Sequence, residues 1–269
     1  MLYEVDQVSR WYGAPGRPGS VLAVDRVSLS VERGERLGIV GESGSGKSTL
    51  VRMMIALDRP TGGEIRFQGQ PVSGRREQDL AELRSSVQLV FQDPRSSLNP
   101  RMRVGQIITE PLRSPLLRRR GHIPADPRAR LAEVTEAVGL PSDAVDRYPH
   151  EFSGGQRQRI AIARALAPEP DVLIADEPVS ALDVSVRAQV LNLLTELVRD
   201  QGLTLVMVSH DLSVVRHVCD TVAVMRRGAL VEHGPAARVY EAPQSDYTTE
   251  LLAAVPRFGT GSLRAGGSR

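Results

Sequence analysis

The chain opens with two segments in which apolar and polar residues alternate. The first covers Leu2–Val8 and the second covers Val21–Val31. A period of two is typical of β-strands that turn one face toward a core. Residues 13–20 between them are rich in glycine and proline and predict a loop. The N-terminal region is therefore expected to be β-structure.

The pattern then changes twice. Arg36–Val40 predicts a short apolar strand, and Leu50–Leu57 predicts a helix after a glycine-rich turn. From about residue 93 to 165 no strand pattern is clear. Helix-like patterns cover Val104–Leu117 and Arg128–Val138, divided by prolines at 111, 115, 124 and 127. This segment predicts an inserted helical lobe.

Strands and helices alternate in the remainder. Apolar runs predict strands at 172–175, 204–208 and 222–225, and amphipathic patterns predict helices at 186–199 and 212–218. Such alternation is typical of an α/β fold with a parallel sheet covered by helices. The Gly- and Ser-rich stretch 257–269 predicts a disordered tail.

Composition excludes several classes of protein. The 269 residues are 41% apolar and 25% charged, which is ordinary for a soluble globular chain. Cys219 is the only cysteine, which excludes a disulfide framework and a cysteine-held metal cluster. The net charge of +2 is too small to favour a nucleic-acid partner. The basic run Arg118–Arg120 fits either a solvated helix end or a contact with acidic headgroups or a partner.

Membrane and secretory segments are not expected. Apolar stretches such as Leu203–Val208 are far shorter than the roughly 20 residues that span a bilayer. Met1–Asp6 contains early acids and no apolar core, unlike a signal peptide. If the protein serves a membrane, other chains must supply the spans.

A glycine-rich loop follows the strand expected at Arg36–Val40. Its residues fit G-x-x-x-x-G-K-[ST]: Gly41, Glu42, Ser43, Gly44, Ser45, Gly46, Lys47 and Ser48. Glycines let backbone N–H groups turn inward around phosphate oxygens, and the helix expected to begin near Gly46 adds its positive end. In this pattern Lys47 reaches the β- and γ-phosphates and Ser48 places its hydroxyl on Mg²⁺. A nucleoside triphosphate site is predicted.

Polar residues end three of the expected strands. Asp176 and Glu177 follow the apolar run Val172–Ala175. Gln92 follows Val87–Phe91, and His210 follows Leu205–Ser209. Ligands of open α/β sheets bind at the carboxyl ends of strands. Asp176 suits Mg²⁺ through water, and Glu177 could polarise an attacking water. Gln92 and His210 are expected to face the same crevice, His210 toward the γ-phosphate.

These motifs resemble those of ABC-type ATPases. Phe152–Gln156 is similar to the family's LSGGQ signature, with Phe in the first place, and Ala181–Asp183 resembles its D-loop. Ser153, Gly154 and Gly155 of the signature are expected to open the helix that carries Arg157–Leu166. Gln92 resembles the Q-loop and His210 the H-loop. The resemblance implies a P-loop NTPase of the ABC type, α/β, with a parallel-sheet core, an N-terminal antiparallel β region and an inserted helical lobe.

The adenine contact is implied by the same resemblance. Tyr12 resembles the aromatic residue that stacks on adenine, although Trp11 beside it could do so. One domain is expected over residues 1–256. Its RecA-like core covers 1–92 and 166–235, its helical subdomain about 93–165 and its C-terminal family tail about 236–256.

Longer segments resemble the oligopeptide/dipeptide/nickel importer ATPases. The segments are Ser96–Pro100, Arg147–His150, Gln156–Arg164 and Pro178–Asn192. Asp246–Pro256 is similar to the family's tail motif HPYTxALL, although Ser245-Asp246 replaces His-Pro. Phe152 in the signature is similar to the F-like member of the family's ATPase pair.

The resemblance implies ATP and Mg²⁺ as cofactors and assigns the site. The nucleotide contacts are Tyr12, Gly41, Glu42, Ser43, Gly44, Ser45, Gly46, Lys47, Ser48, Thr49, Ser153, Gly154, Gly155, Gln156 and Asp183. The metal ligands are Ser48, Gln92 and Asp176, and the catalytic residues are Glu177, His210 and Gln92.

The implied partners form a membrane complex. A second ABC ATPase subunit, favoured as a paralogue over a copy, would complete a head-to-tail dimer around two ATP molecules. Two permeases and an extracytoplasmic solute-binding protein would supply the transport path, with this chain on the cytoplasmic face of the inner membrane. Peptide, nickel and other small solutes remain open as cargo.

Two other classes of function are weighed against the importer. A soluble ABC ATPase that acts on DNA or ribosomes usually has two fused ATPase domains, long coiled coils or zinc cysteines, and this chain has none of them. A regulatory module without turnover is disfavoured by the presence of Lys47, Asp176, Glu177, Gln92 and His210.

Overall fold

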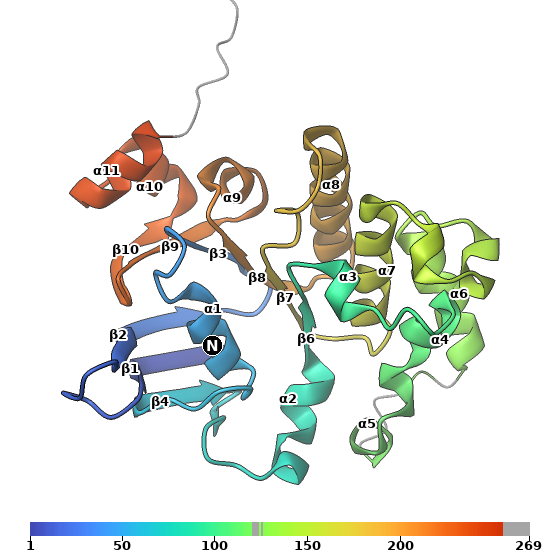
Figure 1. Ribbon diagram of the computed structural model, residues 1–269, viewed down its shortest axis with the longest axis horizontal. Helices are drawn as coiled ribbons and strands as arrows, with labels where there is room; N and C mark the ends of the chain where they lie inside the picture. The colour runs from blue at the N-terminus through green and yellow to red at the C-terminus, as the bar shows by residue number, and fades with distance from the viewer. Residues whose placement is uncertain (120–123, 125, 255–269) are drawn as a thin grey trace, which may run out of the picture.

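The computed structural model describes residues 1–119, 124 and 126–254, and an antiparallel sheet forms its N-terminal part (Figure 1). The sheet has the order β2–β1–β4–β5. Its strands are β1 (Tyr3–Tyr12), β2 (Val21–Val31), β4 (Gly62–Phe67) and β5 (Gln70–Pro71). The alternating segments of the sequence thus form β1 and β2, and the second has the bounds that its pattern predicts.

A second sheet of six strands forms the centre of the molecule, in the order β10–β9–β3–β8–β7–β6. The strands are β3 (Arg36–Val40), β6 (Val87–Val90), β7 (Val172–Asp176), β8 (Thr204–Ser209), β9 (Thr221–Arg226) and β10 (Ala229–Pro235). The pairs from β9 through β6 are parallel, and β10 returns antiparallel to β9. The predicted parallel sheet is confirmed, with one antiparallel edge strand.

The two faces of the six-stranded sheet are buried in different cores. In β7, Leu173 and Ala175 point into one core, whereas Val172 and Ile174 point into the other. This follows from the period of two along a strand. Because both faces are buried, the strands are apolar throughout rather than alternating.

Helices cover one face of this sheet, and helix α1 with the antiparallel sheet covers the other. The helices that precede β6 are α1 (Lys47–Met54) and α2 (Ala81–Ser86). Those that follow β7 are α8 (Val184–Asp200), α9 (Leu212–Val218), α10 (Ala236–Glu241) and α11 (Asp246–Ala253). Helix α1 begins at Lys47 with Gly46 as its N-cap, where the phosphate-loop pattern predicts a helix start. It ends three residues before Leu57, because Ala56 has a left-handed φ of 54° that a helix does not accommodate.

The segment between β6 and β7 is helical and forms the right-hand lobe in Figure 1. Its helices are α3 (Pro94–Ser97), α4 (Val104–Thr109), α5 (Pro115–Arg119), α6 (Pro127–Ala137) and α7 (Gly154–Leu166). Pro111, Pro115 and Pro127 each open a new helical segment, where a missing N–H does no harm. Within the described residues no strand interrupts the lobe, as its pattern predicts.

Two strands, β4 and β10, and two helices, α10 and α11, have no counterpart in the sequence pattern. Strand β4 contains two glycines and two charged residues, and β10 ends in Gly-Pro, so neither carries a clear strand signal. Helices α10 and α11 are short. The predicted disordered tail 257–269 lies outside the described residues, as do Arg120 and the side chains of Arg118 and Arg119.

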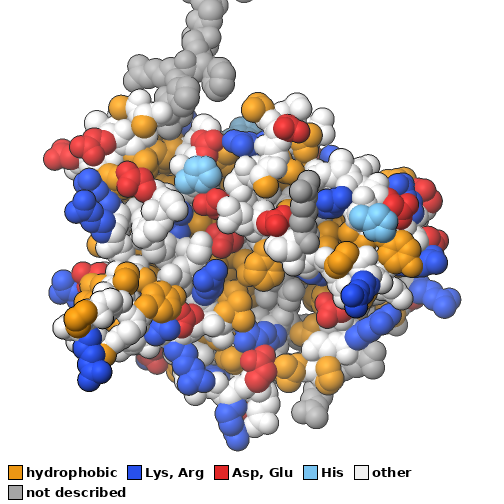
Figure 2. Space-filling model, viewed as in Figure 1, with side chains coloured by type: hydrophobic (Ala, Val, Ile, Leu, Met, Phe, Trp, Pro, Cys, Tyr) orange, Lys and Arg blue, Asp and Glu red, His pale blue; other side chains and the backbone are white. Residues whose placement is uncertain are grey.

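Charged side chains of both signs are mixed on the surface, as the net charge of +2 suggests. Figure 2 shows Lys and Arg side chains interspersed with Asp and Glu side chains over the face viewed.

Among the described residues, no helix combines the length and apolarity that crossing a bilayer requires.

Candidate active site

The carboxyl ends of four parallel strands meet at one edge of the six-stranded sheet. Val40 at the end of β3 lies opposite Ser209 at the end of β8, and Asp176 at the end of β7 lies opposite Val208. The glycine-rich loop therefore starts beside His210 and the two acids. Strand β6 ends at Val90, two residues before Gln92. The sequence prediction that these residues share one crevice follows from this register.

The glycines of the loop are needed where the chain passes close to its neighbours. A Cβ at Gly41, which has a φ of 149°, would lie 2.1 Å from the Met225 carbonyl oxygen. A Cβ at Gly46, with a φ of 101°, would lie 2.3 Å from the Ala23 carbonyl oxygen. Only glycine fits both positions, which is how the loop closes tightly enough to surround a phosphate.

Lys47 is buried inside this loop at the start of α1. Its Nζ donates hydrogen bonds to the carbonyl oxygens of Gly41 (2.7 Å) and Glu42 (2.8 Å). Burial lowers the pKa of Lys47, and the nearby carboxylates of Glu177, Asp176 and Glu42 oppose that shift. A buried ammonium surrounded by loop carbonyls is poised to gain a phosphate partner.

Ser48 and Asp176 meet across the same crevice. The Ser48 hydroxyl donates to Asp176 Oδ1 at 3.1 Å. Burial raises the pKa of Asp176, and the adjacent Glu177 adds to this effect, while the Ser48 hydrogen bond opposes it. A carboxylate that is hard to ionise because of burial is stabilised in its charged form by a cation.

Gln92 and His210 converge on Glu177. Gln92 Nε2 donates to Glu177 Oε2 at 3.1 Å, and His210 Nδ1 lies 3.2 Å from Glu177 Oε1. The Glu177 side chain is 18% exposed, whereas that of His210 is 56% exposed. Glu177 has a left-handed φ of 48°, a strained conformation that places its side chain beyond the end of β7. Its carboxylate thus has two polar orienting partners and access to solvent.

The residues of the signature begin helix α7, as the sequence predicts. The Ser153 hydroxyl accepts from Gln156 N–H, and Gln156 Oε1 accepts from Ser153 N–H at 3.0 Å, which forms a capping box. A Cβ on Gly155 would lie 2.3 Å from Val186 Cγ1, so this glycine allows α7 to approach α8. A Cβ on Gly154 would meet only the flexible end of Leu182, at 3.3 Å.

The segment before α8 joins the signature to the His210 region. Asp183 precedes α8 as its N-cap, and one turn later Arg187 lies 3.6 Å from Asp211 Oδ2. Asp211 follows His210 and caps α9 through a hydrogen bond from Ser213 N–H. Asp183 is exposed, so it is available to another molecule.

Tyr12 lies at the end of β1 with one ring face covered. The Arg10 guanidinium lies 4.6 Å from the ring centroid, and the Tyr12 hydroxyl donates to Asp58 at 2.9 Å. Tyr12 is 39% exposed, while Trp11 is half-buried. The exposure of Tyr12 favours it over Trp11 as a stacking residue.

One contact of the phosphate loop was not anticipated from the sequence. The Glu42 N–H donates to the hydroxyl of Tyr247 in α11, 205 positions away. In the sequence, Tyr247 is distinguished only as part of a tail motif. No local pattern marks such a contact, because it depends on where α11 docks.

The arrangement fits ATP and Mg²⁺. The loop offers N–H groups and a lysine for phosphates, while Ser48, Asp176 and Gln92 offer the oxygen donors that Mg²⁺ prefers. Among the described residues no cluster of three or more His, Cys, Asp or Glu side chains is placed to hold a metal by itself. Such a site suits a metal that shares the phosphates of its nucleotide.

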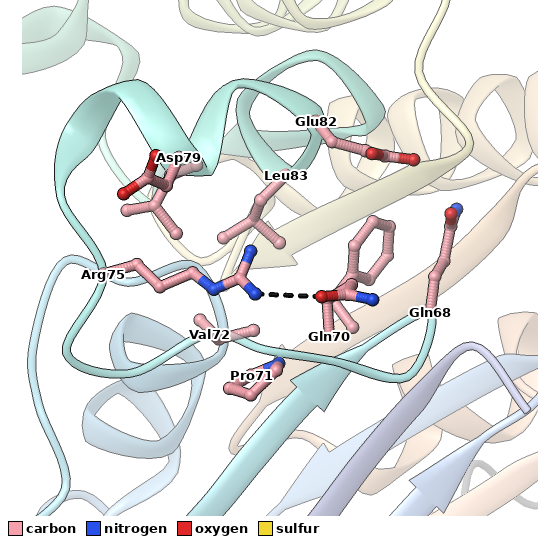
Figure 3. Close-up of a pocket in the computed structure, with 10 residues that line it drawn as sticks. Gln68, Gln70, Pro71, Val72, Arg75, Asp79, Glu82 and Leu83 are labelled. Carbon is pink, nitrogen blue, oxygen red and sulfur yellow. Dashed lines mark hydrogen bonds between the residues drawn. The ribbon is translucent and has the colours of Figure 1, made fainter.

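A separate cavity of about 340 Å³ lies between the antiparallel sheet and α2 (Figure 3). Arg75 donates to Gln70 Oε1 at 2.9 Å across it, and Asp79 and Leu83 line the helical side. None of its lining residues belongs to the predicted site. The phosphate loop and the strand ends remain the candidate active site.

Comparison with known proteins decides the family. A family model described as "ABC transporter" matches residues 24–180. The chain belongs to the ABC transporter family. It is similar to the oligopeptide transport ATP-binding protein OppF of Salmonella typhimurium, 48% identical over 94% of this chain and 75% of the relative. The dipeptide transport ATP-binding protein DppF of Escherichia coli is 50% identical over 91% of this chain and 72% of the relative.

Solved structures agree on the fold. A dimeric post-hydrolysis state of the ATP-binding cassette MJ0796, bound to ADP and Pi, matches with a TM-score of 0.76 and 30% identity, over 87% of this chain and 99% of that one. CbiO1 of Clostridium perfringens, part of an ABC transporter complex, matches with a TM-score of 0.76 and 29% identity, over 95% of this chain and 96% of that one. The predicted ABC-type fold is confirmed.

Membership in this family makes the chain a transport ATPase. The resemblance found in the sequence, the ATPase activity coupled to transport, and ATP with Mg²⁺ as cofactors are confirmed. The alternatives of a soluble ATPase on DNA or ribosomes and of an inactive regulator are disfavoured by the transport relatives.

Proposed function

We propose that this chain hydrolyses ATP to drive uptake of small peptides through partner permeases. The observation that carries the proposal is the identity of 48–50% to oligopeptide and dipeptide transport ATP-binding proteins, over more than nine-tenths of the chain. Tyr247, Thr248, Leu251 and Leu252 retain part of the tail motif seen in the sequence. Both relatives are named for peptide transport, so peptide is favoured over nickel as the cargo.

The position of each site residue supports a distinct role in ATP hydrolysis. Lys47 and the N–H groups of the loop from Gly41 to Thr49 hold the phosphates. Ser48, Asp176 and Gln92 hold Mg²⁺, which would neutralise charge on the phosphates. Glu177 accepts a proton from the attacking water, because its carboxylate lies at the solvent-accessible end of β7. His210 orients Glu177 and contacts the γ-phosphate.

The signature serves a second subunit. Ser153 presents its hydroxyl, and Gly154 and Gly155 present their backbone N–H groups, at the start of the thirteen-residue helix α7, a favourable place for an anion. Ser153 and Gln156 are exposed at that helix start. With Asp183, they contact the nucleotide of a partner in a head-to-tail dimer. The dimeric state of a solved cassette supports such pairing. A paralogue is the favoured partner.

The permeases dock between the core and the lobe. There a groove of about 510 Å³ is lined by Leu57 and Phe91, which are 59% and 43% exposed, together with Arg164 of α7. Phe91 directly precedes Gln92. Figure 2 shows apolar side chains between the two parts of the molecule. A permease helix seated there would bear directly on the active site, and it would place the chain on the cytoplasmic face of the membrane.

The expected division of the chain is part of the proposal. The core comprises 1–92 and 166–235, the helical subdomain about 93–165 and the tail about 236–256.

The solute-binding protein acts on the outer side, through the permeases, and touches no residue of this chain.

Reconstitution tests the function. The chain is co-expressed with two permeases and a second ATPase encoded beside it, and the complex is placed in vesicles with the solute-binding protein outside and ATP inside. Labelled di- and tripeptides are expected to accumulate, and unlabelled peptide but not Ni²⁺ is expected to compete. Uptake of Ni²⁺ without uptake of peptide would overturn the cargo assignment.

The Lys47→Ala variant is expected to bind ATP more weakly, by roughly 10- to 100-fold, because it loses a charge-assisted hydrogen bond to the phosphates. Titration of the purified chain with a fluorescent ATP analogue measures this. Arg66→Ala serves as the control because it removes a cation of β4 that is paired with Glu64, away from the phosphate loop. Unchanged affinity of the Lys47 variant would show that another residue holds the phosphates.

A further inference from the structure

Helix α11 is anchored on the phosphate loop by one buried tyrosine. Tyr247 is 3% exposed, and its hydroxyl accepts a hydrogen bond of 3.2 Å from the Glu42 N–H. The distance is within the normal range for N–H···O contacts. The C-terminal helix therefore touches the backbone of the nucleotide site, although it belongs to a different part of the sequence.

The peptide that Tyr247 contacts is also a peptide that holds Lys47. The Glu42 N–H and the Gly41 carbonyl belong to one trans peptide group, so they point in opposite directions. On the carbonyl side, Lys47 Nζ donates to Gly41 oxygen at 2.7 Å. The tyrosine hydroxyl and the lysine ammonium thus bind the two ends of one peptide dipole, and hydrogen bonds in such a chain strengthen one another.

Several contacts hold Tyr247 in place. The Arg226 guanidinium lies 4.4 Å from its ring centroid and 4.0 Å from the Glu250 carboxylate one turn further along α11. Buried Glu232 of β10 accepts from the N–H groups of Gln244 and Ser245 just before α11. Burial opposes the ionisation of Glu232, but hydrogen bonds outweigh it and lower its pKa. These contacts therefore hold both the start of α11 and the turn that contains Glu250.

The lysine is oriented through these contacts. An ammonium has three hydrogens. Two are directed to Gly41 and Glu42 oxygens, and within the described part of the chain the third has only a long contact of 3.4 Å with Ser45 Oγ. Fixing the first peptide of the loop fixes the Gly41 acceptor, and so directs the remaining hydrogen toward the space inside the loop.

We propose that Tyr247 is a positioning residue for nucleotide binding: it holds the Gly41–Glu42 peptide so that Lys47 is oriented toward the phosphates. The C-terminal helix thereby becomes part of the ATP site without touching the nucleotide. This inference rests on the proposed role of Lys47.

The test compares Tyr247→Phe with Tyr240→Phe in the full chain. Tyr240 in α10 is a matched control, because its ring also lies under an arginine, Arg216, and its hydroxyl binds the Leu212 carbonyl instead of the loop. Tyr247→Phe is expected to weaken MgATP binding about threefold to tenfold, the equivalent of one hydrogen bond. Tyr240→Phe is expected to leave affinity unchanged. Thermal melting of both variants without nucleotide verifies that they are folded.

A double-mutant cycle separates positioning from a general loosening of the loop. In a Lys47→Ala background, Tyr247→Phe is expected to cause no further loss of affinity, because its effect passes through the lysine. An equal loss in both backgrounds, or unchanged affinity of Tyr247→Phe in the wild-type background, would overturn the proposal. Unchanged affinity of Lys47→Ala alone would instead overturn the role of the lysine, which is a distinguishable result.

Discussion

Replacing Glu177 by Gln is expected to retain ATP binding and to lower the rate of ATP hydrolysis by about 10²- to 10⁴-fold, the usual contribution of a general base. The physical reason is local. Gln92 Nε2 and His210 Nδ1 both contact the Glu177 carboxylate. An amide of the same shape can accept from Gln92 and donate to His210, so the geometry survives while the proton acceptor is lost.

The measurement is phosphate release by the complete complex, with ATP affinity determined on the same preparation. Glu169→Gln is the matched control, since Glu169 also has a left-handed φ, of 56°. Its side chain is 61% exposed and precedes β7, whereas Glu177 follows the carboxyl end of that strand. That control should hydrolyse ATP at the normal rate. Near-normal turnover of the Glu177 variant would show that another group activates the water.

Replacing Gly154 by Asp is expected to abolish ATP-driven closure of the dimer while ATP binding to the isolated subunit is retained. A carboxylate at the start of α7 would face the γ-phosphate of the partner's nucleotide, and like charges repel strongly where water is excluded. The phosphate loop of the same chain is untouched. Space for a side chain exists, because a Cβ at Gly154 meets only the movable end of Leu182.

Closure is measured by crosslinking cysteines introduced beside the phosphate loop of one subunit and the signature of its partner, in a background with Glu177→Gln. The native Cys219 does not interfere, because burial raises the pKa of its thiol to about 12. Gly154→Asn has the same shape without the charge and should close far better than Gly154→Asp. Full ATP-dependent crosslinking of the Asp variant would contradict the head-to-tail arrangement, and loss of ATP binding by the isolated variant would place the signature in its own chain's site.

Local patterns were strong enough to predict most of the central elements. Strands β2 and β3 and helix α9 have the bounds expected from apolar periodicity, and Ser153 caps α7 where the signature indicated a helix start. These features depend on short-range chemistry: period, caps and proline. Strand β4 was missed because its Gly62-Gly63 start and its charged residues lack a strand signal. It forms only because β1 provides a hydrogen-bonding partner.

The sequence alone determined the kind of chemistry, since the phosphate loop and the acid pair are contiguous motifs whose residue types suit phosphates and Mg²⁺. Tertiary structure decided which side chains meet. The parallel register brings Asp176 to Ser48 and sets Gln92 and His210 around Glu177, contacts that span from 33 to 128 residues. The docking of α11 likewise places Tyr247 against the loop. The physical reason is that period and propensity act over a few residues, whereas these contacts depend on how strands and helices pack together.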